Sequence, residues 1–514
     1  TQPTVTPVAG VASDRVLTSF DGAKIRMHWF PVSTGKPAPT ILDGPGWGMG
    51  GDTNVSSTDS GLFGNIGIGA LHASGYNVLT WDPRGFGAST GTITVDSPDF
   101  EGKDVERMID WLSAQPGVQL DGTGDPRLGM VGGSYGGGIQ FVTAAIDCRV
   151  DAITPVIAWH SLGTSLAKND TYKSGWGNFL YGFANGRTLD EHLTRGHDVT
   201  NSTGAIPPDV RDWFVSRGPG DDLISKITVP TLIVQGTVDT LFTPDEAIAN
   251  FRVLTAHHVP VAMEWFCGGH GVCLTPAGDT KRIGASIQAW LDRFVKRDTS
   301  VAVVQGFETV DQNGAAWKSD TYPADVITAM HANPAGPSAS TTGGSYVPAR
   351  GAGTLALTAD GGAGPATPPP GGPGVIGSAA LALTPAKATK AVDVTIRPSG
   401  KGLVLGQPVV LLTYRGTAGT GDTRPTRVFA QLVDDATGHV LGNQITPIEV
   451  VLDGKEHTVE AHLESIVYAP TGSSTLTLQL VATTTAYITP QLGGTINFST
   501  IDVALPVPQH LRAE

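Results

Sequence analysis

One serine stands among glycines in RLGMVGGSYGGGIQF (residues 127–141), and this cluster predicts a nucleophile. Glycine inside a strand or helix costs about 0.5 to 1 kcal/mol relative to alanine, so the cluster indicates a geometry that side chains would obstruct. Residues 132–136 match G-x-S-x-G, in which a strained turn between a strand and a helix exposes the serine oxygen. We therefore expect Ser134 to be a catalytic nucleophile; the alternative is a glycine-rich loop with an incidental serine.

The loop QGTVDTLFTPDEA, which follows the apolar run 229–234, contains three carboxylates that could serve as the catalytic acid. Residues 243–246 match an S/T-x-x-E capping box, which gives Asp245 and Glu246 a structural role at a helix start. Asp239 remains, directly after a buried strand. We expect it to be the acid; the alternative is an ordinary solvated aspartate.

The base is expected at His270, which lies among glycines in the loop after the apolar run 261–266. His257 and His258 precede that run and are typical of an exposed helix end. His160 is the main rival, but it comes before the acid in the chain. In a sheet of this order, the catalytic residues follow one another along the chain as serine, then acid, then histidine.

These residues predict acyl-transfer chemistry. His270 would take the proton of Ser134 during attack on a carbonyl and return it to the leaving group. Asp239 would hold the imidazole tautomer and stabilise its charged form.

An oxyanion formed in this attack needs two preorganised donors. The main-chain N–H of Tyr135, the residue after the nucleophile, is one. The second is expected in GPGWGMGG, after the strand pattern at 39–43. Pro45 has no N–H, so either Gly46 or Trp47 must donate.

Strand and helix patterns alternate from about residue 15 to 298, which predicts a parallel sheet covered by helices. The alternation stops at about 160–225, where an aromatic insertion would form a cap over an apolar pocket. We therefore predict a catalytic domain at 1–298 with this cap. Short alternating segments then predict a β sandwich of jelly-roll type at 299–514, with a Gly/Pro-rich loop at 351–377.

Cys267 and Cys273 flank His270, and two interpretations compete: a disulfide loop or a Cys-x-x-His-x-x-Cys metal site. A structural zinc site usually has four ligands in paired clusters, and no second cluster follows, which favours the disulfide. A disulfide indicates an oxidising compartment. The chain begins at Thr1 with a Thr/Pro-rich stretch, so we expect a processed protein that is secreted or in the cell envelope.

The chain has 514 residues and a formal net charge of −14. This length predicts two or three domains. The negative charge and the lack of a long basic run argue against a nucleic-acid partner. No apolar run approaches the roughly 20 residues that span a bilayer, so no transmembrane segment is expected.

The sequence resembles the X-Pro dipeptidyl-peptidase and cocaine-esterase-like hydrolases. The matching segments, in order, are TSFDGAKI, DPRGFGAS, GGSYGG, VPTLIVQGTVDTLFTPDEA, the GGHG loop and VDQNGAAWKSDTYP. The resemblance implies an α/β-hydrolase core, a helical cap, a C-terminal jelly roll, the Ser134, Asp239 and His270 triad, and no metal or organic cofactor. Some members place a tyrosine hydroxyl in the oxyanion hole, whereas this chain has GPGWG there.

The expected activity is cleavage of a carboxylic ester of small-molecule size, because the aromatic cap favours an apolar acyl or alcohol group. The same residues also suit a dipeptidyl-peptidase, whose carboxylates for a free amino terminus could come from Asp190, Glu191, Asp221 or Asp222. An acyltransferase could use the same triad, and the C-terminal β sandwich could belong to a noncatalytic surface- or carbohydrate-binding protein.

Overall fold

The computed structural model describes residues 10–33, 36–58, 66–323, 325–367, 375–400 and 402–513. An eleven-stranded sheet forms the centre of the α/β core. Seven neighbouring strands of this sheet are parallel to one another, namely β4, β3, β7, β8, β9, β10 and β11. The strands follow one another as β1 (Ser13–Thr18), β2 (Lys24–Phe30), β4 (Asn77–Trp81), β3 (Thr40–Gly44), β7 (Leu128–Gly133), β8 (Ala152–Val156), β9 (Thr231–Gly236), β10 (Val261–Phe266), β11 (Phe307–Val310), β12 (Ala316–Ser319) and β25 (Arg512–Ala513). A separate small hairpin pairs β5 (Leu120–Gly122) with β6 (Asp125–Pro126).

Helices cover both faces of this sheet. Consecutive residues of a strand point to opposite faces, so the apolar side chains on each face pack under a different set of helices. Ile41 belongs to the apolar cluster under α1 and α10, whereas Leu42 belongs to the cluster under α2, α3 and α9. The helices are α1 (Ile68–Ala73), α2 (Glu101–Ser113), α3 (Tyr135–Ile146), α9 (Pro244–Ala256) and α10 (Arg282–Phe294).

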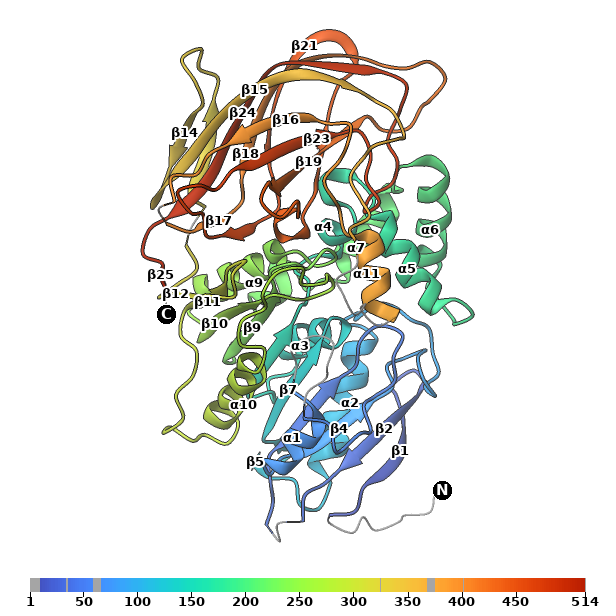
Figure 1. Ribbon diagram of the computed structural model, residues 1–514. Coiled ribbons are helices and arrows are strands. Elements are labelled where there is room, and N and C mark those ends of the chain that lie inside the picture. The colour runs from blue at the N-terminus through green and yellow to red at the C-terminus, as the bar shows by residue number, and fades with distance from the viewer. Residues whose placement is uncertain are drawn as a thin grey trace.

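A helical cap interrupts the alternation between β8 and β9. Figure 1 shows it at the side of the molecule, between the core and the C-terminal sheets. Its Trp176 and Trp213 share one apolar cluster with Tyr135 of the core, so the cap packs directly over the start of α3. The cap elements are α4 (Leu162–Leu166), η1 (Lys168–Asp170), α5 (Ser174–Ala184), α6 (Glu191–Thr203), α7 (Pro208–Ser216) and α8 (Gly220–Ile224).

Two four-stranded antiparallel sheets form the C-terminal β sandwich, at the top of Figure 1. They share one apolar core, with Val394 and Leu478 from one sheet and Leu412 and Ile501 from the other. One sheet has the order β15 (Gly344–Ala356), β24 (Thr495–Pro508), β18 (Val409–Thr417), β21 (Asp453–His462), and the other β16 (Val392–Ile396), β23 (Leu476–Val481), β19 (Arg427–Asp434), β20 (Thr446–Glu449). The smaller elements are β13 (Ile327–His331), β14 (Ser338–Thr341), β17 (Val404–Gly406), β22 (Ile466–Tyr468) and η2 (Leu441–Asn443).

The predicted fold is thus confirmed as an α/β core with a helical cap and a C-terminal β sandwich, while its jelly-roll connectivity stays a prediction. The division at 298 also stays a prediction, although β11, β12 and β25 extend the core sheet from beyond it. They extend the sheet edge one after another: β11 pairs with β10, β12 pairs with β11, and β25 pairs with β12.

The loop predicted at 351–377 is shorter than expected at both ends, which corrects that boundary. Residues 351–356 complete β15, and α11 (Val375–Leu383) begins before residue 377. The strand can pass close to Val394 of the other sheet because residue 351 is glycine. A Cβ atom at this position would lie only 2.5 Å from Cγ2 of Val394. The interval from 357 to 367 is irregular apart from an isolated bridge at Ala363, and residues 368–374 lie outside the described residues.

Candidate active site

Ser134 occupies a strained turn between β7 and α3. Its φ of 56° and ψ of −115° lie where side chains are rarely found. A Cβ atom at Gly132 would lie 2.5 Å from the main-chain oxygen of Gly44, and one at Gly136 would lie 1.9 Å from the same atom. The glycines on both sides of the serine are therefore needed for the close approach of this turn to the end of β3.

The structure brings the three predicted catalytic side chains together from the ends of β7, β9 and β10. His270 Nε2 lies 2.8 Å from Ser134 Oγ, and His270 Nδ1 lies 2.7 Å from Asp239 Oδ2. Asp239 is fully buried, and the other two residues are 7 and 8% exposed. This arrangement can pass the hydroxyl proton to the ring while the carboxylate holds the ring.

The carboxylate of Asp239 is held by its surroundings as well as by the histidine. Its Oδ1 accepts hydrogen bonds from the main-chain N–H groups of Leu241 and Phe242, at 3.0 and 2.8 Å. A Cβ atom at Gly269 would lie 2.6 Å from Oδ2, so the loop that carries His270 can approach the acid only with glycine there.

The cap also binds the loops of the acid and base. The indole N–H of Trp176 donates to Thr240 Oγ1 at 3.0 Å, and its ring meets the ring of His270 edge to face, with 5.7 Å between centroids. The ammonium of Lys173 donates to the Leu241 carbonyl at 2.9 Å. Burial lowers the pKa of this lysine. The sequence analysis did not single out Lys173, because nothing in its local pattern marks a cation that is buried.

The rival acids serve other contacts, and the predicted capping box is wrong. Helix α9 does begin after Thr243, but that hydroxyl donates to Glu464 Oε2 of the β sandwich at 2.9 Å instead of capping the helix. Asp245 accepts hydrogen bonds from Ser465, and Glu246 accepts the main-chain N–H of His160 at 2.8 Å. Contacts with distant segments replaced the local pairing that the pattern suggested.

His160, the rival base, lies over α9 and not beside the nucleophile. Its Nδ1 is 2.9 Å from Asn250 Oδ1, and its Nε2 is 3.3 Å from a carboxylate oxygen of the exposed Asp221.

The residues predicted to supply oxyanion donors line the cavities that contain Ser134: Gly46 and Trp47 line one, and Trp47 and Tyr135 line the other. Among the described residues, no hydrogen bond uses the main-chain N–H of Tyr135, Gly46 or Trp47. The Trp47 ring packs edge to face on the Tyr135 ring with 5.2 Å between centroids, and its indole N–H donates to Leu180 O at 2.9 Å. The ring is thereby anchored to the cap, and the assignment of the second donor stays a prediction.

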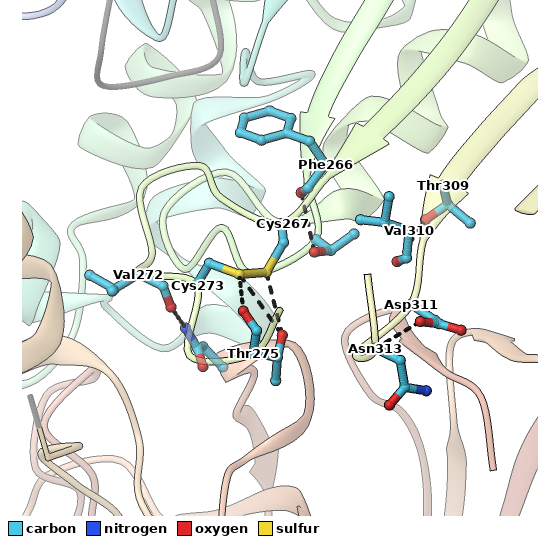
Figure 2. The surroundings of a disulfide bond; sticks show 11 residues. Phe266, Cys267, Val272, Cys273, Thr275, Thr309, Val310, Asp311 and Asn313 are labelled. Carbon is cyan, nitrogen blue, oxygen red and sulfur yellow. Dashed lines mark hydrogen bonds between the residues drawn. A yellow bond between two sulfur atoms is a disulfide. The ribbon is translucent and has the colours of Figure 1, made fainter. Parts of the chain in front are cut away.

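Cys267 and Cys273 form a disulfide with their Cα atoms 5.4 Å apart, which closes the loop that contains His270 (Figure 2). The sulfur of Cys273 contacts the Thr275 carbonyl oxygen at 3.1 Å. Both thiols are consumed in this bond, and the described residues contain no group of three metal-ligating side chains. The Cys-x-x-His-x-x-Cys metal interpretation therefore has no thiolate ligands in this structure.

Two cavities meet at Ser134. The first, which we call the cap cavity, has a volume of about 100 Å³. The second, which we call the α11 cavity, has a volume of about 210 Å³ and also contacts His270. The cap cavity is lined largely by apolar side chains, among them Val95, Tyr135, Trp159, Leu162, Leu166, Leu193, Val210, Phe214 and Phe242. The α11 cavity includes Gly46, Trp47, Met49, Trp176, Phe179, Phe183, Val272, Gly377 and Ala380.

The residues of α11 were missed as lining residues because they belong to the C-terminal part of the chain. Gly377 and Ala380 reach the site from a segment more than 100 residues beyond His270. Figure 1 shows α11 beside the cap helices and away from the sandwich that precedes and follows it in the chain. The apolar run 375–383 was the available sequence signal, since it suits a helix.

Comparison with known proteins agrees with this fold. The family described as X-Pro dipeptidyl-peptidase (S15 family) matches residues 21–271. An uncharacterized 31.7 kDa protein of Escherichia coli, from the traX-finO intergenic region, is 32% identical over 184 residues, which are 36% of this chain and 61% of that protein. The chain thus spans less than two thirds of the length of this relative.

Two solved structures are similar over nearly the whole chain. A CocE/NonD family hydrolase from Staphylococcus aureus has a TM-score of 0.64 at 11% identity, covering 96% of this chain and 93% of the other. An α-amino acid ester hydrolase has a TM-score of 0.69 at 12% identity, covering 98% of both chains. No helix in the described ranges has the length and apolar character to cross a membrane. The match of residues 21–271 to the X-Pro dipeptidyl-peptidase (S15) family model agrees with the serine-hydrolase resemblance of the sequence.

Proposed function

We propose that the protein hydrolyses carboxylic esters with an apolar acyl group through an acyl-enzyme on Ser134. The observation that carries this proposal is the lining of the two cavities at the nucleophile. Among the described residues of that lining there are aromatic and aliphatic side chains but no aspartate or glutamate. Apolar substrate groups would gain from burial in such cavities, at about 25 cal/mol for each Å² removed from water.

The proposed reaction has two halves. His270 takes the proton of Ser134 as its oxygen attacks the ester carbonyl, and the ring then gives this proton to the departing alkoxide, which leaves as an alcohol. In the second half, His270 takes a proton from water, the hydroxide attacks the acyl-enzyme, and the proton returns to Ser134 as the acid departs. The Tyr135 N–H would stabilise both oxyanions.

The chemistry of the leaving group supports different occupants for the two cavities. The departing oxygen must lie next to His270 Nε2. Of these two cavities, the α11 cavity has both His270 and Ser134 in its described lining, whereas the described lining of the cap cavity has Ser134 without His270. We therefore assign the alcohol part to the α11 cavity and the acyl part to the cap cavity. Leu166→Ala should extend the acyl chains that are accepted, and Phe183→Ala should broaden the alcohols. Each substitution should leave the other preference unchanged.

Peptidase activity has less support, because a dipeptidyl-peptidase needs a carboxylate near the site for the substrate ammonium. Asp190 instead accepts the main-chain N–H of His192 at the start of α6. Asp221 is exposed and pairs with His160. Neither residue, nor Glu191 or Asp222, lines the described part of either cavity.

A parallel assay tests the proposed substrate class. p-Nitrophenyl esters of graded acyl length and a panel of X-Pro p-nitroanilides are compared at one pH, with Ser134→Ala as the blank. We expect kcat/KM to be highest for an ester. A higher value for any X-Pro anilide would reject the ester assignment and favour the peptidase.

The disulfide supports a second proposal, that the protein works in an oxidising compartment outside the cytosol. A nonreduced digest of protein recovered from the producing cells and from their medium would test it. The linked peptide should be found in the exported fraction, and reduced protein confined to the cytosol would contradict the proposal.

A further inference from the structure

A turn of the β sandwich touches the loops of both the proposed acid and the proposed base. This turn comprises η2 and the following Gln444, between β19 and β20. The amide Nε2 of Gln444 donates to the main-chain oxygen of Asp239 at 2.8 Å. The amide Nδ2 of Asn443 donates to the main-chain oxygen of Val272 at 3.0 Å, and Figure 2 shows that carbonyl beside the disulfide.

The backbone of this turn is shaped for close contact with the core. Asn443 and Gln444 are 3 and 6% exposed, so their amides are withdrawn from water. Gly442 and Asn443 both adopt the left-handed conformation, with φ of 62° and 56°. A Cβ atom at Gly442 would lie 3.2 Å from the main-chain oxygen of Thr237 in the loop of the acid.

The two bonds have a geometric consequence. The Asp239 loop is fixed internally by its own main-chain donors, and the His270 loop is closed by the disulfide. The two loops also meet directly, because the main-chain N–H of His270 donates to Asp239 Oδ2 at 2.9 Å and that of Thr237 donates to the Phe266 carbonyl at 2.8 Å. Asn443 and Gln444 are neighbours in one buried turn, so their amides add a second connection that holds both loops from the sandwich side.

We propose that Asn443 and Gln444 are positioning residues that keep His270 aligned between Asp239 and Ser134, and that the β sandwich is therefore required for turnover. This inference rests on the proposed triad. A displacement of about 1 Å in a catalytic group can cost roughly 100-fold in rate. Loss of either amide would also leave a buried carbonyl without its partner.

The experiment compares three variants of the full chain. Gln444→Ala removes one bond, and Asn443→Gly removes the other while glycine retains the left-handed backbone. Gln431→Ala is the matched control, because that buried glutamine donates to Ala386 O at 2.9 Å and to Gln479 Oε1 at 3.0 Å, entirely within the sandwich. The measurements are kcat and KM for the best p-nitrophenyl ester, and the thermal unfolding midpoint.

We expect Gln444→Ala and Asn443→Gly each to lower kcat by roughly 10- to 100-fold with little change in KM. Gln431→Ala should lower the unfolding midpoint by a similar amount but keep the wild-type kcat. Wild-type kcat in both turn variants would overturn the proposal. So would a loss of kcat in Gln431→Ala that equals theirs, because this would indicate general destabilisation.

The rate at which a fluorophosphonate modifies Ser134 separates this proposal from the proposed substrate class. The reagent reports activation of the serine without requiring any particular ester. If esters are poor substrates but the reagent modifies Ser134, the positioning role is tested by slower modification in the two turn variants. If wild-type Ser134 is not modified, the triad and the positioning role are both rejected.

Discussion

His270 donates to one oxygen of Asp239 twice: its ring Nδ1 lies 2.7 Å from Oδ2, and its main-chain N–H donates to the same atom at 2.9 Å. The acid thus fixes the backbone and the ring of the proposed base together. Asp239→Asn can direct an amide N–H toward Nδ1, which selects the wrong imidazole tautomer. We expect kcat to fall by about 10⁴-fold.

Asp245→Asn is the kinetic control, since Asp245 lies six residues further along and contacts Ser465. Its kcat should stay near that of the wild type. Equal losses in the two variants, measured as purified proteins at one pH, would remove Asp239 from the triad.

The close approach of Gly136 to Gly44 gives a second prediction. Gly136→Ala would force a Cβ atom to 1.9 Å from a main-chain oxygen at the end of the strand that leads to the predicted oxyanion loop. Because backbone must move, kcat/KM should fall by roughly 100-fold or more. Gly284→Ala in α10 is the control, since its Cβ atom would meet nothing within 4 Å. That variant should be about 1 kcal/mol more stable and fully active.

Loss of the disulfide should affect activity more than stability. The ring that Cys267 and Cys273 close is small, so its effect on the unfolded chain is limited to roughly 2 kcal/mol. His270 lies within this ring among glycines, and its loop should become mobile when the ring opens. We expect the double Cys→Ser variant to lose kcat at temperatures well below its unfolding midpoint. An unchanged kcat there would show that the bond does not position the base.

The sequence predicted which candidate residues lie together, but not the contacts that support them. Ser134, Asp239 and His270 could be predicted as neighbours because each follows a strand within a recognisable local pattern. Gln444 and Lys173 were missed because each contacts the Asp239 loop from a segment that is distant in the chain. The local pattern of a single sequence does not indicate contacts between distant segments. The capping box failed for the same reason, since Thr243 bonds to Glu464 of the sandwich.

Asp245 should make stability depend on pH. Burial and the adjacent Glu464 carboxyl raise the pKa of Asp245 from an ordinary value of 3.8 to about 7. The folded state therefore binds more protons than the unfolded state between these values. The stabilisation from this group is complete below about pH 4 and is lost as the pH rises through 7.

Asp245→Asn removes this titration, so the variant should gain stability relative to the wild type as the pH rises from 4 to 7. The gain should reach at most about 1.4 kcal/mol per pH unit. Denaturant unfolding of both proteins at pH 5 and pH 7 measures it. A stability difference that stays constant, or that moves in favour of the wild type at pH 7, would contradict the raised pKa.

Active-site labelling tests the central claim, that Ser134 is the nucleophile activated by His270. The wild-type protein, Ser134→Ala and His270→Ala are treated with a fluorophosphonate, and the adduct is mapped by peptide mass spectrometry alongside ester turnover. We predict one adduct, on Ser134, in the wild type, none at residue 134 in Ser134→Ala, and very slow labelling in His270→Ala. Substantial turnover by folded Ser134→Ala, or a wild-type adduct on a different serine, would contradict the account.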